Sequence, residues 1–145
     1  MPPVIFYTCL ISGGAAEFFW PLSLSMLDHP VMRIAGMLIG ISGFAFMMAA
    51  HEKFKSVGTS VPTNQAASQC VIKGAYRFSR NPMYVGGSAF FISFGLALGS
   101  LWMILSYLPL GAYLAYYVVP REEAYMTRNF TDEYLAYCRK VRRWL

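Results

Sequence analysis

The sequence predicts an all-α integral membrane protein in which four transmembrane helices form two hairpins, with a cytoplasmic central loop and an amphipathic helical C-terminal tail. Three observations support this fold class. Hydrophobic residues make up 57% of the 145 residues and charged residues only 13%, whereas a typical soluble chain carries roughly 25% charged residues. Four apolar runs are long enough to cross a bilayer, and the basic residues gather outside them. This composition excludes a disordered chain, a collagen-like repeat and a nucleic-acid-binding module.

The apolar runs define the predicted helices. A bilayer core of about 30 Å requires around 20 apolar residues per helix. The runs that meet this requirement are residues 4–27, 31–50, 83–99 and 101–119. The connections within the first pair and within the second pair are too short for an extramembrane domain, so each pair is predicted to form a hairpin. Pro21 and Pro109 are expected to kink or interrupt the helices that contain them.

The remaining residues form a polar central loop, 51–82, and a tail, 120–145, and the whole chain is predicted to be one domain. The tail is expected to begin as a helix with acidic residues in its first turn. A break is expected near Asn129-Phe130, followed by a second helix capped by Thr131. The second helix has an apolar face and a basic face, which is typical of a helix that lies on a membrane surface or on the helix bundle.

The basic residues indicate which side of the membrane is cytoplasmic. Eleven of the twelve Lys and Arg residues lie in 51–80 or in 121–143, and Arg33 is the exception. The positive-inside rule therefore places the N terminus, the central loop, the tail and any active site between them in the cytoplasm. The apolar stretch after Pro3 is longer than the core of a signal peptide, so we expect it to remain as a membrane helix of a multi-pass protein.

The cysteines and glycines indicate packing rather than chemistry. Cys9, Cys70 and Cys138 occur singly, without C-x-x-C spacing, which predicts ordinary thiols and neither a disulfide framework nor a metal site. The spacings Gly36-x-x-x-Gly40 and Gly95-x-x-x-Gly99 allow helices to approach closely, and they also permit a homodimer.

A dense motif lies where the basic loop enters the third predicted helix. It reads Gly74-Ala75-Tyr76-Arg77-Phe78-Ser79-Arg80-Asn81-Pro82-Met83-Tyr84-Val85-Gly86. This segment resembles the signature G-x-Y-x-x-x-R-H-P-x-Y-x-G of the isoprenylcysteine carboxyl methyltransferase and phospholipid methyltransferase group. The group has a second block, a pair of acids followed by F-G-x-E-Y-x-x-Y, and Glu122-Glu123 followed by the segment 130–137 is similar to it. The resemblance extends over about 58–145.

The resemblance implies an integral membrane enzyme that transfers a methyl group from S-adenosylmethionine to a hydrophobic or lipid-like acceptor at the cytoplasmic face. By position it implies cofactor contacts at Tyr76, Asn81, Pro82, Met83, Tyr84 and Glu122, and also at Gln69, Cys70 and Val71. Asn81 stands where the eukaryotic members have His, so no imidazole can titrate there. Thr131 replaces the Gly of the second block, and Val118 stands near an arginine of the prenylcysteine enzymes. The acceptor group therefore stays open among a carboxylate, a thiol and an amine.

The residue types also suit this cofactor on physical grounds. Glu122 can accept hydrogen bonds from ribose hydroxyls or from the amino group, and Arg80 can pair with the cofactor carboxylate. Tyr76 or Tyr84 can cover the purine or the sulfonium. Direct displacement requires no protein nucleophile. The predicted catalytic residues are therefore Arg80, which aligns the cofactor, and Glu123, the nearest base if the acceptor is an amine.

Each of these residues also has a purely structural interpretation. Arg77 is the alternative to Arg80 for the cofactor carboxylate, but both of them, like Lys73, can anchor lipid headgroups. Glu122-Glu123 can complement the dipole of a helix that begins after a proline. Asn81-Pro82 can begin a helix, with Asn as the cap and Pro in the first turn.

Glu17 lies within the first predicted span and does not belong to either motif. An acid within a membrane is costly and is interpreted as functional by default, here as a substrate contact at the acceptor entrance. The competing hypothesis is a four-helix proton-coupled multidrug exporter that uses Glu17, which leaves the loop 51–81 and the tail 121–145 without a role. An NADPH-dependent membrane reductase and a non-catalytic assembly subunit are further alternatives.

Overall fold

The structure is a computed structural model that describes residues 2–22, 24–56 and 71–145. All regular secondary structure in these ranges is helical, which confirms the all-α part of the predicted fold class. The first elements are α1 (Pro2–Phe19), α2 (Pro30–Ser56), the short 3-10 turn η1 (Gly74–Arg77) and α3 (Pro82–Leu98). The later elements are α4 (Leu101–Leu105), α5 (Tyr107–Tyr113), the π-helical turn η2 (Leu114–Val118), α6 (Val119–Asn129) and α7 (Thr131–Lys140).

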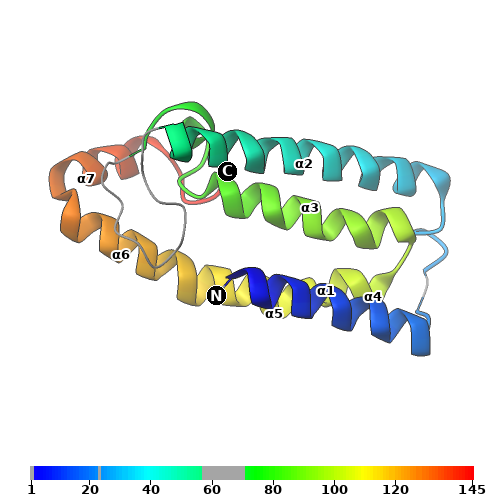
Figure 1. The fold of residues 1–145 in the computed structure, drawn as a ribbon. Coiled ribbons are helices and arrows are strands. Elements are labelled where there is room, and N and C mark those ends of the chain that lie inside the picture. The colour runs from blue at the N-terminus through cyan, green and yellow to red at the C-terminus, as the bar shows by residue number, and fades with distance from the viewer. Residues whose placement is uncertain (1, 23, 57–70) are drawn as a thin grey trace.

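The helices lie side by side in an elongated bundle (Figure 1). α2 packs along α3, α3 also contacts α4 and α5, and α1 lies along α4 and α5. α6 extends beyond the other helices, and α7 turns back so that the end of the chain lies near the start of α3 (Figure 1). The start of α3, η1, α6 and α7 therefore gather at one end of the bundle.

Small residues allow the backbones of α2 and α3 to touch. A Cβ atom on Gly86 would lie 2.5 Å from the carbonyl oxygen of Gly43, and one on Gly36 would lie 2.7 Å from the amide nitrogen of Ala97. Gly36 and Gly40 are buried in this contact. The glycine spacing that suggested a homodimer is therefore used within one molecule, and the homodimer stays a prediction without that support.

Two predicted helix boundaries are wrong. α1 ends at Phe19 and not at 27, because Pro21 disfavours helical backbone in the residue before it. α2 continues to Ser56 and not only to 50, because no glycine or proline interrupts its last turns. The predicted turn after α3 is confirmed. Gly99 adopts a left-handed conformation with φ of 71°, and Ser100 caps α4 by accepting a hydrogen bond from a backbone N–H.

The fourth helix also runs further than predicted. α4, α5, η2 and α6 form a continuous stretch from Leu101 to Asn129, whereas the sequence predicted an end at 119 and a separate helix after Pro120. Pro120 lacks the N–H that would continue the α-helical pattern, and the wider turn η2 ends at Val118, two residues before it. The break after Asn129 is confirmed. The predicted cap is wrong, because Phe130 and not Thr131 occupies the N-cap of α7.

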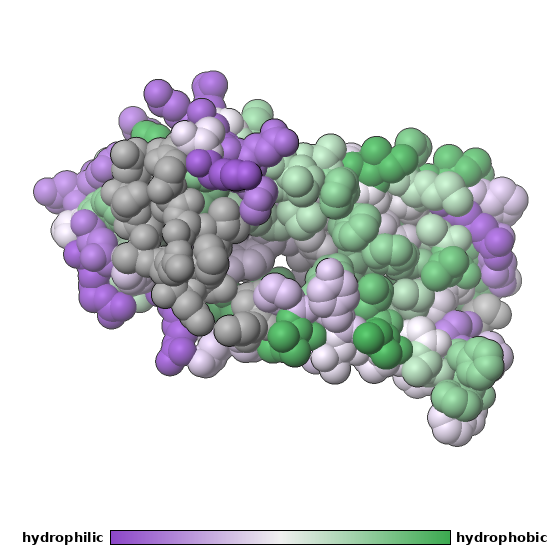
Figure 2. Space-filling view, in the orientation of Figure 1, coloured by the Kyte–Doolittle hydropathy of each residue, from purple (hydrophilic) through white to green (hydrophobic). Residues whose placement is uncertain are grey.

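The apolar helices have the character of membrane helices. Pro30–Ser56 and Leu101–Asn129 are long and apolar enough to cross a bilayer, and Pro3–Phe19 and Pro82–Leu98 are shorter apolar helices. Large apolar side chains on them face outward, as Ile11 and Ile41 do with 70% and 69% exposure. Figure 2 shows hydrophobic residues over the body of the bundle and hydrophilic residues at the end formed by α6 and α7. Such an exposed apolar surface marks contact with a membrane or a partner.

Candidate active site

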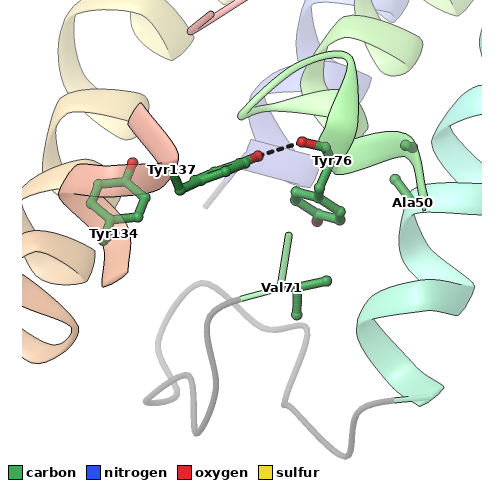
Figure 3. Packing of buried hydrophobic residues seen from close by; sticks show 6 residues of the cluster. Ala50, Val71, Tyr76, Tyr134 and Tyr137 are labelled. Atoms are coloured by element: carbon green, nitrogen blue, oxygen red, sulfur yellow. Dashed lines mark hydrogen bonds between the residues drawn. The ribbon is translucent and has the colours of Figure 1, made fainter. Parts of the chain in front are cut away.

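Two segments that are distant in the sequence meet at the polar end of the bundle. Figure 3 shows Tyr76 of η1 between Ala50 of α2 and Tyr137 of α7, with Val71 close by. The Tyr137 hydroxyl donates a hydrogen bond to the carbonyl oxygen of Tyr76 at 2.6 Å. All four residues belong to one buried hydrophobic cluster. The two motif blocks of the sequence are therefore in direct contact.

A second contact joins the start of α3 to α6. The Tyr84 hydroxyl donates a hydrogen bond to Oε1 of Glu122 at 2.7 Å, and both side chains are partly buried. Burial raises the pKa of the Glu122 carboxyl above its ordinary value, and the hydrogen bond from Tyr84 opposes this only in part while it fixes the orientation of the acid. Tyr84 and Glu122 come from different motif blocks, so this bond places a carboxylate beside the first turn of α3.

Two tyrosines at this end keep their protons at neutral pH. Burial raises the pKa of the Tyr76 phenol above its ordinary value, and the neighbouring Tyr137 and Glu122 raise it further. Burial is also the main cause that raises the pKa of Tyr134, followed by the charge of Glu123. Both phenols therefore stay neutral within the buried cluster.

Two arginines hold Glu123. Its Oε1 lies 3.2 Å from Nη2 of Arg80, and its Oε2 lies 2.6 Å from Nη2 of Arg143. The Arg80 and Glu123 side chains are only 16% and 14% exposed, so this contact is largely shielded from water. A guanidinium therefore lies at each carboxylate oxygen of Glu123. Sequence reasoning selected both Arg80 and Glu123 but did not foresee that they pair.

Arg80 stays charged and retains unused hydrogen-bonding capacity. Burial disfavours its charge, but a hydrogen bond with Cys138 and the charge of Glu123 outweigh this effect and raise its pKa. Its Nε is buried and has no hydrogen-bond partner among the described residues. A buried donor without a partner is costly and suits a ligand that would supply an acceptor.

The residues after α7, 141–145, fold across the start of α3; we call them the C-terminal segment. The carbonyl oxygen of Arg143 accepts hydrogen bonds from Nδ2 of Asn81 at 3.0 Å and from the Ser79 hydroxyl at 3.3 Å. The Arg80 N–H donates to the carbonyl oxygen of Arg142 at 3.0 Å. Asn81 is buried at the N-cap of α3 but makes no side-chain cap bond, so its amide serves to hold the C-terminal segment. Sequence reasoning missed this segment.

The other predicted site residues lie as follows. Val71 and Met83 pack in or against the buried cluster, and Pro82 is buried as the first residue of α3. Arg77 is exposed at the end of η1. Gln69 and Cys70 lie outside the described residues, so their predicted cofactor contacts stay predictions. Val118 of η2 is buried in a separate cluster with Phe91 of α3 and Leu114 of η2.

Glu17 is not brought to this site. It lies in the last turn of α1, and its Oε2 accepts a hydrogen bond from the Ser100 hydroxyl at 2.5 Å. Tyr84 lies about 21 Å along α3 from Leu98, the last residue of that helix, and Ser100 follows in the turn beyond it. Glu17 therefore belongs to the opposite end of the bundle. Nothing in the described part of the chain or in the comparisons below supports the exporter hypothesis.

A family model described as phospholipid methyltransferase matches residues 31–133. The chain belongs to this family. The match begins at the start of α2 and ends in the first turn of α7, so it includes Tyr76, Tyr84 and Glu122. The comparison with curated proteins and the comparison with solved structures found no match.

Membership in the phospholipid methyltransferase family confirms the resemblance seen in the two motif blocks. It makes the protein a methyltransferase that acts on membrane lipid-like substrates. The two long apolar helices agree with this and indicate a membrane protein. α1, which carries Glu17, lies outside the matched residues.

Proposed function

We propose that the protein transfers a methyl group from S-adenosylmethionine to a lipid-like acceptor at the cytoplasmic face of the membrane. The observation that supports this most strongly is the meeting of the two motif blocks, in which Tyr84 of one donates to Glu122 of the other. The residues present fit the cofactor, because a carboxylate, neutral aromatic rings and a guanidinium with a free donor all lie at one end of the bundle.

Glu122 is the principal cofactor contact in this proposal. One of its oxygens holds Tyr84, and the other has no hydrogen-bond partner among the described residues, so it can accept from ribose hydroxyls or from an amino group. Tyr76 and Tyr84 offer neutral rings to the purine or to the positive sulfur. The unpartnered Nε of Arg80 suits the carboxylate of the amino-acid end. Pro82 and Met83 would form apolar walls.

Bound S-adenosylmethionine supplies an electrophilic methyl group on a sulfonium. The protein residues then have to align the acceptor, exclude water and match the dispersed charge, and none of them has to act as a nucleophile. Glu123 is engaged with Arg80 and Arg143, which favours a positioning role for it over that of a base. A carboxylate or thiolate acceptor would need no base, and an amine would lose its proton after transfer.

We also propose that the chain crosses the bilayer four times, with both termini in the cytoplasm. α1 and α3 have 18 and 17 residues, which lies within the range for a span. Nε1 of Trp102 donates to the Trp20 carbonyl oxygen at the far end of the bundle. At the polar end, Arg121 lies over the Tyr117 ring at 4.4 Å. Trp102 and Arg121 are separated by about 28 Å of helix, close to the thickness of the hydrocarbon core.

Calorimetry on the purified protein tests the proposal. S-adenosylmethionine should bind to the wild-type protein and NADPH should not. Glu122→Gln should weaken binding by about 10- to 100-fold, because a charged hydrogen-bond acceptor is lost. Glu52→Gln, an exposed acid on α2 that lies outside both motif blocks, serves as the control and should bind like the wild type. Binding of NADPH instead, or equal affinity in the two variants, would contradict the proposal.

A further inference from the structure

A second feature adjoins the candidate site. A groove of about 490 Å³ runs between α3 and α5. Val85, Ser88, Tyr107 and Gly111 line it from the two helices, and Trp144 and Leu145 of the C-terminal segment also line it. Its volume lies in the range of small-molecule binding sites, about 300–1,000 Å³. Neither motif block predicts this groove, and the family match ends before Trp144.

The groove is lined by residues next to those of the candidate site. Val85 directly follows Tyr84 in the first turns of α3, and the Ser88 hydroxyl donates to the Tyr84 carbonyl oxygen at 2.7 Å. On the other wall, Trp144 directly follows Arg143, which pairs with Glu123 at 2.6 Å. A molecule whose polar end reached Tyr84 could therefore extend its remainder along the groove without leaving the protein.

The chemistry of the lining points to a hydrocarbon occupant. The Tyr107 hydroxyl donates to the Ser88 hydroxyl at 2.7 Å, and Ser88 in turn donates to the Tyr84 carbonyl. A carbonyl can only accept, so the direction of this chain is fixed and both hydroxyl protons are used within the protein. The groove therefore offers these donors to no phosphate or carboxylate, and the side chains of Val85 and Leu145 are apolar. A flexible apolar chain gains free energy by leaving water for such a surface.

The C-terminal segment is fixed in position and can act as a wall. Four contacts hold it: the N–H of Arg80, the Ser79 hydroxyl and the Asn81 amide each donate to its carbonyl oxygens, and Arg143 pairs with Glu123. These contacts join the wall to the residues that begin α3. The width of the groove is thereby coupled to the same residues that form the candidate site.

We propose that this groove holds the hydrocarbon chain of the methyl acceptor and that Trp144 and Leu145 select that chain by its width and length. The assignment of the occupant as the acceptor rests on the proposed methyltransferase function. The binding of a hydrocarbon chain in the groove does not. The experiment therefore measures occupancy first and chain selection second.

Occupancy is measured by the fluorescence of Trp144 as the only tryptophan, in a Trp20→Phe, Trp102→Phe background. The protein is placed in phosphatidylcholine nanodiscs, and a lysophosphatidylcholine with a dibrominated acyl chain is added as the quencher. A chain bound in the groove should quench Trp144 saturably at a low fraction of quencher, and the unbrominated lysolipid should compete. The matched control retains Trp102 alone, which lines a separate groove between α1 and α4, and should show only gradual, unsaturated quenching.

A substitution that fills the groove tests whether the acyl chain of the quencher binds there. Ala115 also lines it, and Ala115→Phe should weaken the saturable component by about fourfold for each methylene displaced. Equal quenching of Trp144 and Trp102, or a saturable component that Ala115→Phe leaves unchanged, would overturn the proposal. Calorimetry with S-adenosylmethionine on the same samples separates the two ideas: no cofactor binding with saturable quenching intact would refute the proposed function and leave the groove assignment standing.

Chain selection is measured by mass spectrometry of methyl-labelled lipids from cells fed labelled methionine. Trp144→Ala should widen the range of chain lengths and branching among labelled species, whereas Leu135→Ala, an exposed apolar residue on α7, should leave the range unchanged. An identical range in wild type and Trp144→Ala would contradict the selective role of Trp144.

Discussion

Both ends of the bundle hold partly buried glutamates, but the contacts around these acids differ. At the far end, Glu17 accepts one hydrogen bond from the Ser100 hydroxyl, which caps the next helix. At the polar end, Glu123 contacts two guanidinium groups, and Glu122 accepts from Tyr84. The far end therefore joins two helices, whereas the polar end gathers charged and aromatic groups from η1, α3, α6 and the C-terminal segment.

The difference shows that an acid in an apolar sequence is by itself weak evidence for a site. Glu17 is the more conspicuous residue in the sequence, because apolar residues surround it. The hydrogen bond that it accepts from Ser100 joins α1 to the turn between α3 and α4. Glu122 and Glu123 belong to a region where groups of opposite charge and several chain segments converge, which is what a charged cofactor with many polar groups requires.

Substitution of the two glutamates should lower stability far more at the polar end than at the far end. Glu123→Ala would leave Arg80 shielded and without its counter-charge, and removal of one partner from such a pair costs about 3–5 kcal/mol. Glu17→Gln keeps an oxygen for the Ser100 hydroxyl, so the free energy of unfolding should change by less than about 1 kcal/mol. Denaturant unfolding in detergent micelles measures both. A larger loss of unfolding free energy in Glu17→Gln than in Glu123→Ala would contradict the view that the polar end holds the more strongly coupled acid.

Alkaline pH should destabilise the polar end through its buried phenols. The pKa values of Tyr76 and Tyr134 are raised in the folded protein, mainly by burial. Their contribution to stability is therefore complete below the ordinary phenol pKa of about 10 and is lost as the pH rises through the higher folded-state values. Between these two pKa values, each phenol should lower the free energy of unfolding by about 1.4 kcal/mol per pH unit. In the Tyr76→Phe, Tyr134→Phe protein, the free energy of unfolding should fall less steeply with pH above about 10. An unchanged pH dependence of the free energy of unfolding would contradict the burial of these two phenols.

The contact between the motif blocks should be measurable through one hydroxyl. Tyr137→Phe removes the hydrogen bond to the Tyr76 carbonyl oxygen, and this should lower the free energy of unfolding by about 1–2 kcal/mol. Cofactor affinity should fall as well, because the bond joins η1 to α7. The control is Tyr117→Phe, whose hydroxyl accepts from exposed Arg121 and should contribute less than about 0.5 kcal/mol. Equal effects for the two variants would indicate that the block contact has no special role.

The smallest expected effect concerns the C-terminal segment. Arg143 is 44% exposed, so Arg143→Ala should change global stability by only about 0–1 kcal/mol. Hydrogen exchange at residues 141–145 should nevertheless become faster, because the side-chain anchor of the segment is lost. Asp28→Asn, which breaks an exposed pair with Arg33 at 3.2 Å, should leave that exchange unchanged. Unaltered exchange in Arg143→Ala would show that the backbone contacts alone hold the segment.

The sequence predicted the residue types of the site and the apolar helices because both depend on local patterns. The motif around Tyr76, Arg80 and Tyr84 specifies side chains at fixed spacing, and Glu122-Glu123 follows an apolar run. The end of α1 was misjudged because hydropathy alone continues past Pro21, and this error made Glu17 look central in its span. The continuous helix through Pro120 was missed because a π-helical turn leaves no clear signal in composition.

The C-terminal segment was missed for a different reason. Three of its four contacts are hydrogen bonds from Ser79, Arg80 and Asn81 to two backbone carbonyl oxygens, and every residue has a carbonyl oxygen. The side chains that could have indicated a role were Arg143, next to many other basic residues, and Trp144, a large apolar residue at the end of a basic stretch. Neither has a helical or strand periodicity that predicts what it contacts.

Photolabelling with methyl-labelled S-adenosylmethionine, followed by peptide mass spectrometry, tests most directly whether the two motif blocks form one cofactor pocket. Ultraviolet irradiation of the purified wild-type protein should place label on peptides from both 71–86 and 119–137, and excess S-adenosylhomocysteine should remove it from both. Label confined to one block, or label on α1 near Glu17, would contradict a shared pocket at the polar end.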